Sequence, residues 1–109
     1  MDFYDQVTER LKLTNSDIAQ GDGPLAKIEA FSCFEDQNDE LVVNVYFVMP
    51  DPPEGADDWD AYIQDQLCGL ARLRLDGVGY PTCWFRTRDE FDDDQESDWI
   101  FIDQVPVDG

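Results

Sequence analysis

Histidine is absent from this 109-residue chain, and lysine and arginine together number 7 against 26 aspartates and glutamates. Without histidine and without paired cysteines, the usual catalytic triads and structural zinc sites cannot be assembled. Without clustered basic side chains, the chain cannot neutralise a phosphate backbone, which excludes direct binding to nucleic acid. The same acidity opposes binding to an anionic membrane surface.

Long apolar runs and paired cysteines are missing as well. The longest apolar stretch, 41–49, is interrupted by Asn44 and is far shorter than the roughly 18 residues of a membrane span. Cys33, Cys68 and Cys83 make an odd set without C-x-x-C spacing, which is typical of free thiols in a reducing compartment. We expect a cytoplasmic protein, in the host cytoplasm if it is encoded by a phage, with no cofactor.

The rest of the composition indicates a folded protein. Hydrophobic residues make up 42% of the chain and aromatic residues 13%, so the high charge does not indicate disorder. Residues up to Gly55 carry 12 acids and three bases, and the remainder carries 14 acids and four bases. The net charge of -19 is therefore spread along the whole chain and is not concentrated in a terminal tail. We expect one compact acidic domain over 1–109.

Apolar periodicity predicts the elements of the first half. Residues 1–13 have apolar side chains four apart, the pattern of an amphipathic helix, and the polar run 14–17 is expected to end it. Alternation predicts strands at 25–35 and 40–49, joined by a hairpin turn. The second strand is apolar on both faces, which predicts a central strand covered on both sides.

The second half repeats the order of helix, strand and strand. Asp57 or Asp58 is expected to cap a second helix, and strands are expected at 80–88 and 99–105, across an acidic loop at 89–97. The predicted fold is therefore α+β, with a four-stranded antiparallel sheet backed by two helices in the order α-β-β-α-β-β.

Catalytic and metal-binding motifs are missing. The sequence has no G-x-S-x-G elbow and no phosphate-binding loop. The acids of 89–98 offer oxygen ligands for calcium or magnesium, but they lack the spacing of an EF-hand loop. We expect a non-enzyme with no metal site, in which this segment is a solvated loop.

The acidity itself suggests a partner. A charge of -19 equals that of about 32 Å of duplex DNA, close to the roughly 34 Å diameter of a domain this long. In composition the chain resembles phage-encoded inhibitors of restriction or CRISPR complexes, and bacterial immunity proteins that neutralise nuclease toxins. The resemblance implies an acidic DNA mimic that occupies the basic groove of a nucleic-acid-binding protein.

Eleven acids are the candidate phosphate surrogates of such a mimic. Four lie on the predicted second helix and seven in the late acidic segment. They are Asp57, Asp58, Asp60, Asp65, Asp89, Glu90, Asp92, Asp93, Asp94, Glu96 and Asp98.

Two other interpretations stay open. An immunity protein would bind one cognate toxin tightly through complementary charge. A protein adapted to a high-KCl cytoplasm would also be acidic and poor in lysine, and only Lys12 and Lys27 occur here. A homodimer through the exposed edge of the sheet would double the mimicked length, and the residues do not decide whether it forms.

Overall fold

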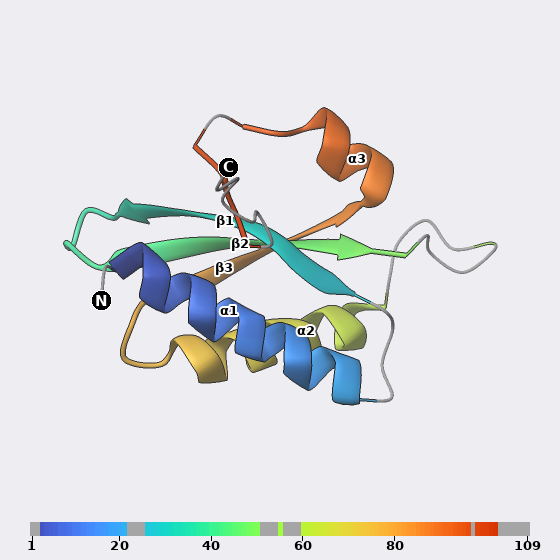
Figure 1. The fold of residues 1–109 in the computed structure, drawn as a ribbon, viewed down its shortest axis with the longest axis horizontal. Helices are drawn as coiled ribbons and strands as arrows, with labels where there is room; N and C mark the ends of the chain where they lie inside the picture. Colours follow the sequence, from blue (N-terminus) through green and yellow to red (C-terminus); the bar gives the residue numbers. More distant parts are fainter. Residues whose placement is uncertain (1–2, 22–25, 51–54, 56–59, 97, 103–109) are drawn as a thin grey trace, which may run out of the picture.

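The structure is a computed structural model that describes residues 3–21, 26–50, 55, 60–96 and 98–102. It is an α+β fold with three helices and a mixed four-stranded sheet (Figure 1). In chain order the elements are α1 (Phe3–Gln20), β1 (Lys27–Glu35), β2 (Leu41–Met49), α2 (Ala61–Leu75), β3 (Tyr80–Thr87), α3 (Arg88–Asp93) and β4 (Ile100–Phe101).

The strand order is β3-β2-β1-β4, and the prediction of a purely antiparallel sheet is wrong. β1 pairs antiparallel with both β2 and β4, but β3 pairs parallel with β2, from Val42 opposite Tyr80 to Met49 opposite Thr87. The reason is that α2 connects β2 to β3. Such a helical crossover returns the chain to the end of the sheet where β2 began, so β3 runs in the same direction as β2.

The sheet is covered on both faces (Figure 1). Helices α1 and α2 pack on one face over the main core, in which Val43, Val45 and Phe47 of β2 are fully buried. On the other face, a smaller cluster joins Ala30, Val48, Phe91 and Trp99 beneath α3. The central position of β2 and its coverage on both sides are confirmed.

The first helix does not end at 14–17 as expected, but continues to Gln20. The Thr14 hydroxyl donates to the carbonyl of Arg10 at 3.0 Å, one turn earlier. The Asn15 amide donates to the carbonyl of Ile28 at 2.9 Å, and its oxygen accepts from the Ile28 N–H at 2.7 Å. The Thr14 hydroxyl bonds one turn back within the helix and the Asn15 side chain is engaged by β1, so neither side chain ends the helix by capturing a local backbone group.

The late acidic segment also differs from its prediction, because residues 88–93 form α3 and bring the helix count to three instead of two. The following strand, β4, comprises Ile100 and Phe101. Residues 103–105 of the predicted strand lie outside the described residues, as do Asp57 and Asp58. The prediction that Asp57 or Asp58 caps the second helix is wrong, because α2 begins at Ala61 and Asp60 is its N-cap.

Asn15→Ala should lower the free energy of unfolding by about 1–3 kcal/mol, because it leaves the N–H and C=O of Ile28 without their side-chain partner. Urea unfolding measures the change, and Ser16→Ala on the exposed side of the same turn is the control. An effect no larger than that of the control would show that the contact between Asn15 and Ile28 does not hold α1 against β1.

Candidate functional site

Helix α3 begins with a reciprocal cap. The Glu90 N–H donates to the Thr87 hydroxyl oxygen at 3.3 Å, and the Glu90 carboxylate accepts from the Thr87 N–H and hydroxyl, each at 3.0 Å. These hydrogen bonds lower the pKa of Glu90. The sequence could have predicted this helix start, because Thr87 and Glu90 are three residues apart and precede an apolar residue, which is the pattern of a capping box.

A buried aromatic side chain holds α3 on the sheet. Phe91 is 1% exposed and stacks on Trp99 with ring centroids 5.1 Å apart, while Phe101 meets it edge-on at 6.1 Å. A helix this short is not stable without tertiary contacts. The cap and Phe91 therefore give a fixed backbone to a segment that the sequence alone suggested was a loop.

The seven candidate acids of this segment are all exposed, on α3 and on the turn that follows it. We call them the α3 acidic surface. It comprises Asp89, Glu90, Asp92, Asp93, Asp94, Glu96 and Asp98.

Two arginines partly neutralise this surface. Arg86 lies 3.4 Å from Asp94, and Arg88 lies 3.7 Å from Asp92 and also pairs with Glu29 on β1. These contacts are exposed, so each adds little stability.

Four members of the α3 acidic surface form no ion pair within the described part of the chain. The carboxylates of Asp89, Asp93, Glu96 and Asp98 have no ion pair with any residue that the structure describes. Residues 86–98 contain seven acids and two bases, so the segment keeps a net charge of 7 minus 2, or five negative charges. These four carboxylates are the ones most available to a cationic partner.

The other candidate group is not brought together with this surface. Asp60 caps α2 by accepting from the Tyr62 N–H at 3.0 Å, and Asp65 is exposed on the same helix. Because α2 and α3 cover opposite faces of the sheet (Figure 1), one flat binding groove cannot contact both groups. Asp57 and Asp58 lie outside the described residues.

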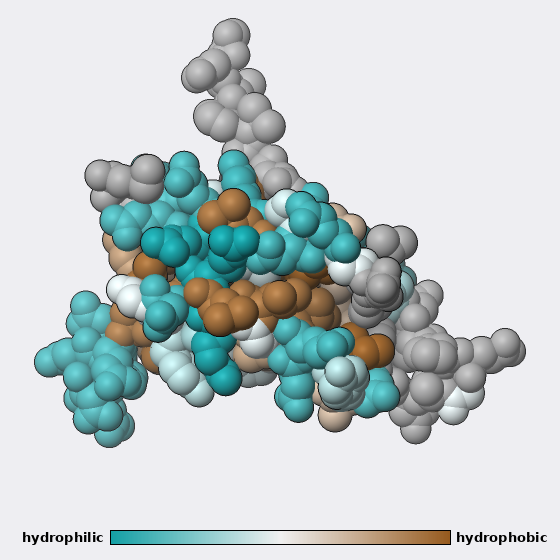
Figure 2. Space-filling model, turned by 90° about the horizontal axis from the view of Figure 1, so that it is seen from below, coloured by the Kyte–Doolittle hydropathy of each residue, from teal (hydrophilic) through white to brown (hydrophobic). Residues whose placement is uncertain are grey.

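The face formed by α1 and α2 carries a feature that the sequence reasoning missed, an apolar groove of about 970 Å³. Ile63, Leu67, Leu70 and Leu73 line it, and Leu73 is 75% exposed. Figure 2 shows the apolar surface on this side of the molecule, with polar groups around it. The feature of the sequence that could have indicated the groove is Leu73, an apolar residue that lies outside the buried stripe of α2.

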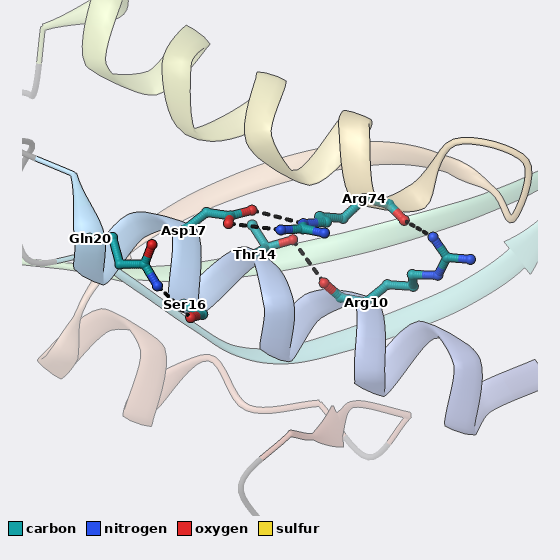
Figure 3. Close-up of polar contacts among 6 residues, drawn as sticks. All are labelled: Arg10, Thr14, Ser16, Asp17, Gln20 and Arg74. Atoms are coloured by element: carbon teal, nitrogen blue, oxygen red, sulfur yellow. Dashed lines mark hydrogen bonds and ion pairs between the residues drawn. The ribbon is translucent and has the colours of Figure 1, made fainter.

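A bidentate ion pair joins the two helices beside this groove (Figure 3). Arg74 donates to both carboxylate oxygens of Asp17, at 2.8 and 2.9 Å. The hydrogen bonds from Arg74 hold the pKa of Asp17 below its ordinary value. Arg10 in turn donates to the Arg74 carbonyl at 3.3 Å. Arg74 is therefore occupied within the protein.

Nothing in the described part of the chain indicates a metal centre or a membrane helix. No three side chains of Cys, Asp or Glu come together there as metal ligands, and none of its helices is long and apolar enough to cross a membrane. Comparison with protein-family models, curated proteins and solved structures finds no match.

Removing unpaired charge should stabilise the protein at low salt. We expect Asp93→Asn with Glu96→Gln to raise the melting temperature in 0.05 M KCl, because both acids repel their neighbours and Asp93 also lies at the negative end of α3. The gain should shrink at 0.5 and 3 M KCl, as the Debye length falls to about 4 Å and then to about 2 Å. Circular dichroism on heating measures both.

The matched control is Asp92→Asn with Asp94→Asn, which removes the same charge but also removes two ion pairs with arginines. It should raise the melting temperature less. Equal gains from the two double variants would mean that the arginines do not neutralise Asp92 and Asp94.

Proposed function

We propose that this protein is an acidic inhibitor that occupies the basic nucleic-acid-binding groove of a target protein, such as a phage-defence complex of the CRISPR or restriction type. The observation that carries the proposal is the α3 acidic surface, a set of exposed carboxylates on a helix fixed by its cap and by Phe91. A fixed array loses less conformational entropy on binding than a mobile loop does. It therefore suits the replacement of a regular phosphate backbone.

The distribution of charge supports this function. Helices α1 and α2 carry four acids and four bases between them, so their net charge is zero, and the remaining residues carry all of the -19. The acid excess thus lies outside the two large helices. An uneven distribution of charge steers a protein toward a cationic groove and orients it there.

The dimensions agree with mimicry of a short duplex. The radius of gyration is 14.1 Å, and the extents along the principal axes are 44, 38 and 28 Å. About 32 Å of duplex carries the same charge as this chain.

Two alternatives are kept. An immunity protein would use the same acidic surface against one nuclease toxin. Adaptation to high salt is supported by a different observation, the acids at 35–40 of the β1–β2 hairpin, of which Glu35, Asp39 and Glu40 are exposed on an element far from α3. A salt-adapted chain would require near-molar KCl to fold, and its acids would have no partner.

The inhibitor function is tested with a panel of purified restriction, CRISPR and nuclease-toxin proteins. We expect this protein to bind one of them, duplex DNA to compete, and affinity to fall linearly with salt on a logarithmic scale. Asp89→Asn, Asp93→Asn and Glu96→Gln together should weaken binding by at least about tenfold, because three phosphate surrogates are lost.

The control removes charge from the hairpin instead, with Asp39→Asn and Glu40→Gln. Asp39 has a φ of 60°, a conformation that asparagine also tolerates, so the turn is preserved. Binding that duplex DNA does not displace would refute mimicry. Equal losses from the two sets of changes would refute a specific role for the α3 acidic surface.

A further inference from the structure

Two of the three cysteines lie against each other in the tertiary structure. The Sγ atoms of Cys68 on α2 and Cys83 on β3 are 2.8 Å apart, closer than the roughly 3.5–4.0 Å at which non-bonded carbon atoms pack. A disulfide needs about 2.05 Å between its sulfurs. Only a small movement therefore separates this pair of thiols from a covalent bond.

The third cysteine is kept apart by the sheet. Cys33 on β1 is opposite Val43 of β2, and Cys83 on β3 is opposite Val45. Since β1 and β3 flank β2, they lie about 9–10 Å apart. Burial raises the pKa of the Cys33 thiol to about 11, but it is the distance across β2 that keeps Cys33 from pairing with Cys83.

We propose that Cys68 and Cys83 form an intramolecular disulfide that links α2 to the edge strand β3. The oxidant is a small-molecule disulfide such as oxidised glutathione. One cysteine thiolate attacks it and releases one glutathione thiol, and the second cysteine attacks the mixed disulfide and releases the other. The two cysteines lose two protons and two electrons, and the oxidant gains them as two thiols.

The position of the pair gives the bond a structural effect. The disulfide would close the segment between Cys68 and Cys83 into a covalent loop, and it would join the helical layer directly to the sheet. Such a link restricts the unfolded chain, in which repulsion among the acids favours expansion. Burial raises the pKa of Cys83, so oxidation should be slow at neutral pH and faster under alkaline conditions.

The test exposes the folded full-length protein to excess oxidised glutathione, counts the remaining thiols and maps the linked peptides by mass spectrometry. We expect the number of thiols to fall from three to one, Cys68 to be linked to Cys83, and the melting temperature to rise by roughly 10–20 °C. Cys33→Ser should behave in the same way, with no thiols left. Cys68→Ser and Cys83→Ser should show no internal link and no gain in melting temperature.

Protein unfolded in guanidinium serves as the control for the oxidant. If the unfolded chain oxidises while the folded chain keeps all three thiols, or if Cys33 is found linked in the folded chain, the proposal is refuted.

A separate observation concerns the exposed side of α2. Gly69 lies in the middle of this helix, at the groove, and apart from its chain neighbours and the adjacent helix backbone no atom lies within 4 Å of the position that a Cβ would occupy. A glycine in a helix interior is destabilising relative to alanine, and nothing inside the protein requires it here. A residue without a side chain lets another helix approach closely.

The charges around Gly69 complement each other under a two-fold axis. Asp65 and Arg72 are both exposed, four residues before and three residues after this glycine. With a rise of about 1.5 Å per residue, two antiparallel helices crossing at Gly69 would place Asp65 of each copy opposite Arg72 of the other. Tyr62 and Leu73, which are 67% and 75% exposed, would be covered in the same contact.

The geometry points to a homodimer in which the α2 helices of two copies cross at Gly69. A second copy fits because α1 and α2 have no net charge, whereas contacts elsewhere on a chain of -19 would set acids against acids. The pairing is isologous, with each copy using the same groove. This inference does not depend on the inhibitor function.

Sedimentation velocity between micromolar and submillimolar concentration tests the dimer. Gly69→Gln should weaken the dimer by at least about tenfold through a steric clash, without lowering the melting temperature of the monomer, because glutamine is a better helix former. Asp65→Arg should also weaken it, and adding Arg72→Asp should restore it. Dimerisation should strengthen with salt, opposite to the binding expected of the α3 acidic surface.

A monomer at every concentration would refute this interface. A dimer that Gly69→Gln does not affect, as expected for pairing through the edge of the sheet, would also refute it, as would failure of the charge exchange to restore association.

Discussion

The structure depends on one strand that is apolar on both faces. β2 cannot expose either side to water, so the fold must place a layer on each. Helices α1 and α2 form the larger layer, and α3 with Trp99 forms the smaller one. The crossover through α2 and the helical form of the late acidic segment both follow from this requirement. The α3 acidic surface is fixed in position for the same reason, because Phe91 of α3 has to cover the second apolar face of β2.

Electrostatic repulsion is the opposing constraint. A chain of -19 resists compaction, and several of its few cations form contacts within the fold. Arg74 joins the two large helices through Asp17, and Arg88 joins α3 to β1 through Glu29. Four of the seven basic residues lie on α1 and α2, which leaves these helices neutral. The rest of the chain carries the whole acid excess as a consequence.

As a result of these two constraints, the two faces of the sheet carry surfaces that suit different kinds of binding. Helices α1 and α2 border an apolar groove, and α3, on the opposite face of the sheet, presents exposed carboxylates. Association of two copies through the helical side would leave both α3 acidic surfaces directed outward, so self-association and inhibition can coexist. The proposed link between Cys68 and Cys83 would join the same helical layer to the sheet and leave the acidic side unchanged.

The sequence by itself determined the α+β class, the central strand with two apolar faces, the helix and strand order of residues 3–87, and the acid excess. Each of these depends on composition or on local periodicity. The tertiary structure decided the parallel direction of β3, the continuation of α1 past Asn15, and which carboxylates are paired. It alone brought Arg88 to Glu29, 59 positions away, and Cys68 to Cys83. Periodicity shows which side of an element is apolar, but it does not show by which connection the chain returns to the sheet. That connection sets strand direction and long-range contacts, and through them the shape of each candidate surface.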